Sequence, residues 1–141
     1  MTARPPFHLA FTVRDVPEAK DFYVNLIGCT AGAESPDWIV LDFFGHKVSA
    51  YRHPRADRLA AGQPIHDDDI SSRHFGAILD EPAFNALAER LTAAGVEFIT
   101  RPQRLDAGRR GEQLIMFLRD PSGNALEFNC LAHAETLFHP E

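Results

Sequence analysis

The stretch FHLAFTVRDVPEAKDFYVNLIG (residues 7–28) shows the order of elements from which this chain is built. A short apolar segment with one histidine, His8, is followed by Asp15, a residue type that often caps a helix. Pro17 suits a first helical turn, and apolar residues then recur at helical spacing until Gly28, where a helix can end. The stretch therefore predicts a β-strand followed by an amphipathic helix.

The same order returns in RHFGAILDEPAFNALAERLTAAG (73–95). Here a short apolar segment with one histidine leads to Asp80 and Pro82, and an apolar helical stripe then runs to a closing glycine, Gly95. Such a correspondence between two parts of one chain predicts an internal repeat rather than two unrelated segments.

Each of these stretches is followed by further strand-like segments. The first module continues with a weak strand near 29–34 and with DWIVLDFFGHKVSAYR (37–52), which turns at Gly45. The second continues with VEFIT (96–100) and with GEQLIMFLRDPSGNALEFNC (111–130), whose DPSGN segment is a strong hairpin signal. The chain is therefore expected to contain two βαβββ modules of an α+β fold.

The repeat also predicts the domain organisation. The chain of 141 residues has the length of one domain. We expect a single domain over residues 1–141, with module 1 at about 6–53, a polar linker at 54–72, module 2 at about 73–131 and a C-terminal tail at 132–141.

Composition narrows the classes of function. The net charge is −6 with both signs mixed along the chain, which argues against nucleic acid as a partner. The basic segment 101–110 is interpreted as a solvated loop, with attraction of an anionic substrate as the alternative. Two cysteines make no disulfide framework, and neither a membrane span nor a secretory leader is visible. We therefore expect a cytoplasmic protein that binds a small molecule and no membrane.

The alternation of side chains along the strands places three ionisable residues on one kind of face. His8 lies opposite a bulky apolar face in the first strand, His74 does so in the strand after the linker, and Glu127 does so in the last strand. A carboxylate on an inner face is costly without a cation or partner. Two imidazoles and one carboxylate form the facial triad most often found on Fe(II). The alternative is three separately satisfied polar residues.

At this point the sequence resembles the vicinal oxygen chelate superfamily, which includes glyoxalases, bleomycin-resistance proteins, fosfomycin-resistance thiol transferases and extradiol dioxygenases. The motifs that carry the resemblance are FHLAFTVRDVPEAKDFYVNLIG, RHFGAI and RDPSGNALEF, within about 7–130. The resemblance implies paired βαβββ modules that form a half-open, mixed β-sheet barrel with the helices outside. It also implies that His8, His74 and Glu127 hold a divalent metal.

One position departs from the family members with four ligands. Aligning Gly45 with Gly123 places Ser49 where the first module would offer a carboxylate opposite Glu127. A serine cannot be the proton-shuttling base of a glyoxalase-type isomerase, so that activity is disfavoured. The three-ligand pattern instead resembles extradiol dioxygenases and fosfomycin-type transferases.

Further site residues follow from the resemblance and from the strand faces. The candidates for acid/base catalysis are His66, His46 and Tyr51, because ring opening requires a proton to move. For the two histidines the alternative is a solvated loop position. The candidates for substrate binding on the inner face are Trp38, Gln113 and Phe117, with Asp42 beside them. Phe117 stands in about the region where extradiol enzymes carry a tyrosine, and Trp38 and Phe117 could instead merely fill the barrel.

The sequence therefore predicts a metal-dependent enzyme, a ring-cleaving non-haem Fe(II) dioxygenase of extradiol type acting on a small catechol-like aromatic. Mn(II) and Zn(II) are the alternative metals. The alternative functions are a fosfomycin-resistance-like thiol transferase and a metal-free drug-binding protein of the bleomycin-resistance type. We expect a homodimer, in which the barrel could take one module from each chain.

Overall fold

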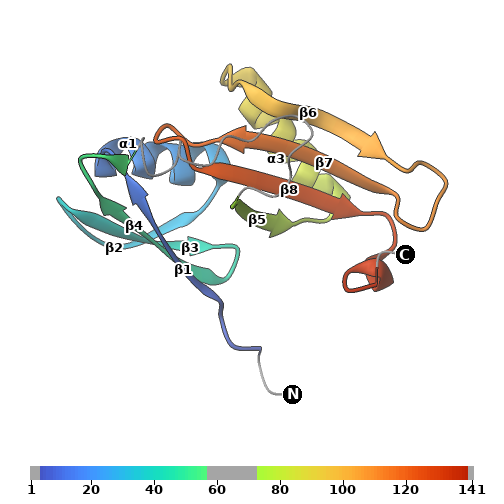
Figure 1. Cartoon of the computed structure of the whole chain (residues 1–141), viewed down its shortest axis with the longest axis horizontal. Helices are drawn as coiled ribbons and strands as arrows, with labels where there is room; N and C mark the ends of the chain where they lie inside the picture. Colours follow the sequence, from blue (N-terminus) through green and yellow to red (C-terminus); the bar gives the residue numbers. More distant parts are fainter. Residues whose placement is uncertain (1–3, 57–72, 140–141) are drawn as a thin grey trace. The chain divides into compact units, whose positions relative to one another are not determined.

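The computed structural model describes residues 4–56 and 73–139. Their contacts divide them into two compact units, coloured from blue to green and from yellow-green to red in Figure 1. The first unit contains the described residues up to 56 together with the turn 120–124, and the second contains 73–119 and 125–139. Each unit is an open, mixed sheet of four strands with a helix on one face. The predicted pair of βαβββ modules is confirmed.

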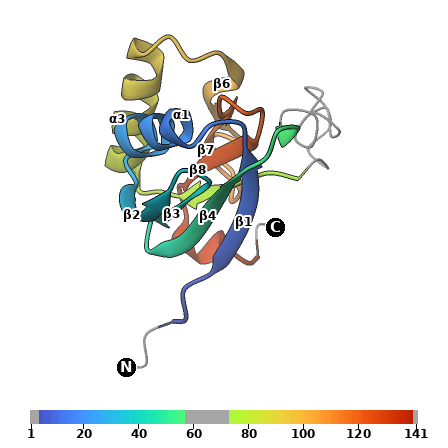
Figure 2. The ribbon, with the colours of Figure 1, turned by 90° about the vertical axis from the view of Figure 1, so that its left-hand side faces the viewer.

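The first unit carries its strands in the spatial order β1-β4-β3-β2, with β1 parallel to β4 and the other neighbours antiparallel. Its elements are β1 (His8–Val13), α1 (Val16–Lys20), η1 (Asp21–Ile27), β2 (Thr30–Ser35), β3 (Trp38–Phe43) and β4 (His46–Arg52). Figure 2 shows α1 lying over one face of this sheet. The opposite face carries His8, Lys47 and Ser49.

The helix of the first unit begins and ends where the sequence predicts. The Asp15 side chain accepts from the backbone N–H of Glu18, and Gly28 ends the helix in the left-handed region with φ 95°. Between them the helix changes character, because α1 continues as the π-helix η1. Apolar spacing over seven residues does not distinguish a π-helix from an α-helix, so this feature was not predicted.

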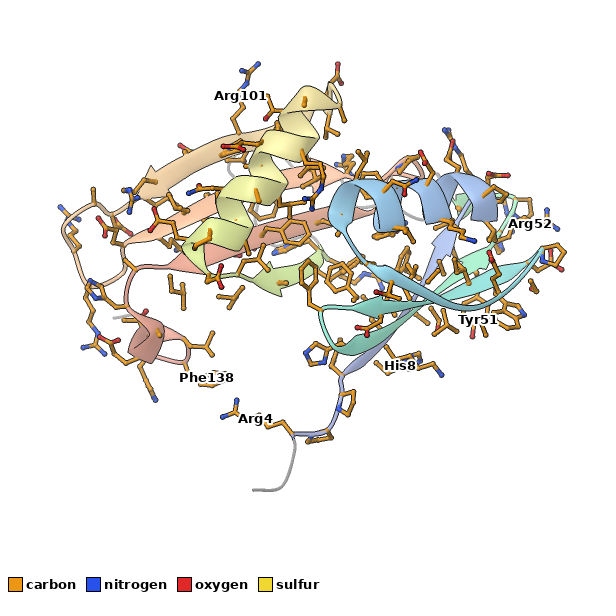
Figure 3. The ribbon with its side chains drawn as sticks, turned by 180° about the vertical axis from the view of Figure 1, so that it is seen from behind. Arg4, His8, Tyr51, Arg52, Arg101 and Phe138 are labelled. Atoms are coloured by element: carbon orange, nitrogen blue, oxygen red, sulfur yellow. The ribbon has the colours of Figure 1, made fainter. Side chains whose placement is uncertain are left out.

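The second unit repeats the arrangement with the order β5-β8-β7-β6, in which β5 and β8 are parallel. Its elements are β5 (Phe75–Ile78), α3 (Glu81–Ala93), β6 (Phe98–Leu105), β7 (Gln113–Arg119) and β8 (Ala125–Leu131), followed by the 3-10 helix η2 (Ala134–Thr136). Seen from behind, α3 crosses the face of β7 and β8 (Figure 3). Its apolar stripe of Phe84, Leu87 and Leu91 is buried.

Strand register shows that the two modules correspond residue by residue. In the first unit Ala10 pairs with Ser49, and in the second Gly76 pairs with Glu127. Ala10 and Gly76 each come two residues after a histidine. His8 and His74 are therefore equivalent positions, and Ser49 occupies the place that Glu127 has in the second module.

The turn between β7 and β8 is built around a buried carboxylate. Asp120 is 4% exposed and accepts from Tyr23 Oη at 2.7 Å, from the backbone N–H of Ser122 at 2.9 Å, and from the backbone N–H and Nδ2 of Asn124 at 2.8 and 2.9 Å. Burial raises the pKa of Asp120, and the hydrogen bonds oppose that rise by stabilising the ionised form. Burial also raises the pKa of Tyr23 well above its usual value, so the phenol stays protonated and donates.

We expect Asp120→Ala to lower the free energy of unfolding by about 3 kcal/mol, because it leaves the buried Tyr23 hydroxyl and the turn amides without an acceptor. Urea denaturation measures the change. The control is Tyr23→Phe, which removes one donor and leaves the other three, and which should cost only about 1 kcal/mol. Equal losses in the two variants would contradict a carboxylate that organises the whole turn.

Candidate functional site

The candidate site lies on the face of the second sheet opposite α3. Glu127 on β8 is flanked by Gly76 on β5 and by Phe117 on β7, which are its partners in the strand register. Paired positions in a sheet share a face, so the Glu127 side chain lies on the same face as the Phe117 ring. His74 comes two residues before Gly76, just ahead of β5, and approaches the same face.

His74 and Glu127 meet directly. His74 Nε2 lies 3.0 Å from Glu127 Oε2, and each side chain is 22% exposed. The Phe117 ring packs edge-on against the imidazole, with ring centroids 5.0 Å apart. The arrangement confines the imidazole beside the carboxylate while leaving both accessible from the open face.

A carboxamide network holds the other side of Glu127. Asn129 Nδ2 lies 3.1 Å from Glu127 Oε1 and 2.9 Å from Gln113 Oε1. Gln113 was predicted as a substrate-binding residue, but the role of Asn129 was missed. The signal that could have revealed it is its spacing, because Asn129 comes two residues after Glu127 and so shares its face.

Gly76 allows β5 to approach β8 at this site. A Cβ added at Gly76 would overlap the carbonyl oxygen of Glu127 and would lie 2.6 Å from its carbonyl carbon. These are backbone atoms that cannot rotate away. Glycine is therefore required for the close pairing that sets His74 beside Glu127.

The corresponding open face of the first sheet carries the other predicted residues. The register places Lys47 beside His8, Asp42 beside Lys47, and Trp38 beside Tyr51. Figure 3 shows His8 and Tyr51 on the side of this sheet away from α1. Tyr51 pairs with Thr12, four residues beyond His8, which is about 13 Å along the strand at the usual rise per residue. Tyr51 therefore shares the face of His8 without being adjacent to it.

The His8 ring makes a polar contact with the neighbouring strand β4. Its Nδ1 lies 3.2 Å from the backbone carbonyl oxygen of Lys47. A carbonyl can only accept, so Nδ1 is the donor in this contact, which in the neutral imidazole leaves the lone pair on Nε2. This orientation by a backbone carbonyl is typical of histidines that bind metals.

The remaining predicted residues are placed differently. His46 pairs with Phe43, so its position lies on the other face of the sheet from Lys47, and its Nδ1 accepts from the backbone N–H of Phe7 at 2.8 Å. His66 lies outside the residues that the structure describes. Ser49 is buried on the same face as His8.

The thiols of the chain are unsuited to act as nucleophiles. Cys29 and Cys130 are free and buried. Burial, followed by the charge of Asp42, raises the pKa of Cys29 to about 12, and burial also raises the pKa of Cys130. Since the thiolate is the reactive form, the chemistry of the site belongs to its imidazole and carboxylate groups.

Within the described residues, neither unit by itself gathers three or more His, Cys, Asp or Glu side chains as a metal site would need. In the second unit His74 and Glu127 are two possible ligands, so a site with three protein ligands would need one more residue. Across residues 4–56 and 73–139, no helix is long and apolar enough to cross a membrane.

Comparisons with known proteins agree with this two-module fold. The family model of the glyoxalase/bleomycin resistance protein/dioxygenase superfamily matches residues 6–128. A crystal structure of a glyoxalase/bleomycin resistance protein/dioxygenase from Alicyclobacillus acidocaldarius is 32% identical, with a TM-score of 0.77 over 94% of this chain and 96% of that one.

Two further relatives carry more specific names. Virulence protein STM3117 of Salmonella typhimurium is 25% identical over 122 residues, which cover 86% of this chain and 81% of that protein. The fosfomycin resistance protein FosX of Listeria monocytogenes is 17% identical, with a TM-score of 0.68 over 96% of this chain and all of that one, a likeness of fold alone. The extent of the family match decides the assignment: the chain belongs to the glyoxalase/bleomycin resistance protein/dioxygenase superfamily.

Proposed function

We propose that this chain is a metal-dependent enzyme of its superfamily, in which His8, His74 and Glu127 bind a divalent cation. We further propose that the cation is Fe(II) and that the reaction is extradiol-type cleavage of a small catechol-like aromatic. The observation that carries the proposal is the pair of donor atoms His74 Nε2 and Glu127 Oε2, 3.0 Å apart on an open face.

The spacing of this pair is that of a hydrogen bond donated by His74 Nε2–H, and it also fits a shared cation, which would displace that proton. Two ligand bonds of about 2.1 Å that meet near a right angle place their donor atoms about 3 Å apart. Imidazole nitrogen with one carboxylate oxygen is also the donor chemistry of non-haem iron sites. His8 adds a second imidazole, whose Nδ1 contacts the Lys47 carbonyl, so that Nε2 is the nitrogen left to face a cation.

The chain's own groups would bind and orient an aromatic substrate. The Phe117 ring beside His74 suits a flat ring, which aromatic side chains hold by stacking. Trp38 and Tyr51 share the face of His8 but lie about 13 Å along the strand from it, so they would contact a more distant part of a substrate. When bound, a divalent cation would supply the positive charge that favours the deprotonated catechol oxygens. We propose that His66 provides the acid/base group, as the resemblance implies from its place shortly before His74.

A thiol transferase is less well supported, because one arginine of the basic segment, Arg104, already has two carboxylate partners. Arg104 lies 3.6 Å from a carboxylate oxygen of Glu81 and 3.6 Å from one of Glu112. An anionic substrate would have to compete with these two carboxylates. Extradiol cleavage of a catechol does not require a basic pocket for an anionic substrate.

Anaerobic purification followed by elemental analysis and oxygen uptake tests the proposal. We expect about one iron per chain, as one facial triad holds, and oxygen consumption when substituted catechols are added. Bound manganese or zinc without oxygen uptake would contradict the dioxygenase and favour thiol transfer or isomerisation. A protein that binds no divalent metal would contradict the whole proposal and favour a binding protein.

Light scattering on the same samples tests the proposed homodimer.

A further inference from the structure

The hydrogen bonds of Asn129 fix the orientation of two amide groups, its own and that of Gln113. A carboxylate can only accept, so the group that Asn129 presents to Glu127 Oε1 must be its NH2 group. The same nitrogen lies 2.9 Å from Gln113 Oε1 and uses its second hydrogen there. Both amide orientations therefore follow from the charge of Glu127.

As a result, the two carboxylate oxygens of Glu127 have different partners. Oε1 is held by Asn129 at 3.1 Å, while Oε2 faces His74 Nε2 at 3.0 Å. A carboxylate held in this way cannot exchange its oxygens by rotation without breaking the hydrogen bond to Asn129. The oxygen beside the imidazole is then fixed before any cation arrives.

The consequence for Gln113 is that its nitrogen is turned away from Asn129. Its Oε1 is occupied, and no group in the described part of the chain accepts from its Nε2. Gln113 lies on the same face of the sheet as Glu127, because the register separates them by even steps along β7 and β8. As far as residues 4–56 and 73–139 are concerned, its two N–H groups are available on this face to an oxygen acceptor.

We propose that Asn129 is a positioning residue of this site, which presents one oxygen of Glu127 to the cation and the NH2 group of Gln113 to a substrate oxygen. The inference rests on the proposed function and adds to it a class of ligand. The substrate should carry an oxygen acceptor, such as a phenolate, carbonyl or carboxylate, next to the atoms that bind the metal.

The variant Asn129→Leu tests this role because leucine keeps a similar volume and removes both donors. Cobalt(II), added to the metal-free full-length protein, is the probe, and its visible absorption reports both its binding and the arrival of a catechol. We expect Asn129→Leu to weaken cobalt(II) binding about 10- to 100-fold, as is usual when a partner of a ligating carboxylate is lost. Asn129→Ala is the second variant should leucine impair folding, which thermal unfolding of the metal-free protein monitors.

Gln113→Leu is the matched variant, because it leaves the contact between Asn129 and Glu127 intact. We expect Gln113→Leu to keep its cobalt(II) affinity within about twofold of the wild type. Its affinity for catechol, read from the change in the cobalt(II) spectrum, should fall about 10-fold or more, which is the usual cost of losing one hydrogen bond to a charged group. A wild-type protein that binds no cobalt(II) would overturn the proposed function and this inference together. Normal cobalt(II) binding by both Asn129 variants would overturn the role of Asn129 alone.

Discussion

Replacing Glu127 with glutamine should reduce the affinity for a divalent cation about 100-fold. Structural zinc sites with four protein ligands bind the metal with about 10–16 kcal/mol, so each ligand of such a site contributes about 3 kcal/mol. At about 1.4 kcal/mol for each tenfold change, this is a loss of two orders of magnitude. Glutamine keeps the shape of the side chain and an oxygen that can accept from Asn129, so the sheet should remain intact.

The chain offers a matched control for this experiment. His133 and Glu135 form a second His–Glu pair, with Nδ1 and Oε1 4.0 Å apart and with side chains that are 47% and 70% exposed. Glu135→Gln should leave metal affinity unchanged. His74→Ala should weaken binding as much as Glu127→Gln does, and oxygen uptake should fall in the same two variants. If Glu127→Gln bound cobalt(II) as tightly as the wild type, the His74–Glu127 contact would be only an ion pair.

Replacing Gly76 with alanine should have the largest effect on stability. The new Cβ would overlap the backbone carbonyl of Glu127, so β5 and β8 would have to separate. We expect a loss of about 3 kcal/mol or more in the free energy of unfolding, at or above the upper end for overpacked interiors. Because natural domains are stable by only about 5–15 kcal/mol, this is a large part of the total.

The same substitution should also weaken the candidate metal site, because His74 lies just ahead of β5 and its position depends on the pairing of β5 with β8. We expect weaker metal binding in Gly76→Ala even under conditions in which the protein is folded, measured beside urea denaturation. Gly32→Ala is the control, because a Cβ there would meet the carbonyl oxygen of Val40 at 3.2 Å and would require only a small adjustment. Equal stability losses in the two variants would contradict a special close approach at Gly76.

Local signals in the chain were sufficient to predict the two modules. The helix starts at Asp15 and Asp80 are confirmed, since each side chain accepts from a backbone N–H three residues later. These features depend on capping and on side-chain periodicity, which act over a few residues and are therefore visible in any window of sequence. The equivalence of His8 and His74 followed from the same repeat and agrees with the strand registers.

The position of His46 could not be predicted in the same way. It is one of the acid/base candidates, and only the register shows that its position lies on the opposite face from Lys47. A shift of one residue in a strand moves a side chain to the other face. The resemblance to the family supplied the candidate ligands, but it did not supply the register around this turn.

The amino-acid sequence by itself determined the repeat, the helix boundaries, the inner faces of the strands and the superfamily to which the chain belongs. Only the tertiary structure decided that His74 meets Glu127, that Asn129 joins Glu127 to Gln113, and that Gly76 must lack a side chain. The first set depends on interactions between neighbours in the chain. The second depends on the parallel pairing of β5 with β8, which brings together residues 53 positions apart and leaves no periodic mark in the sequence.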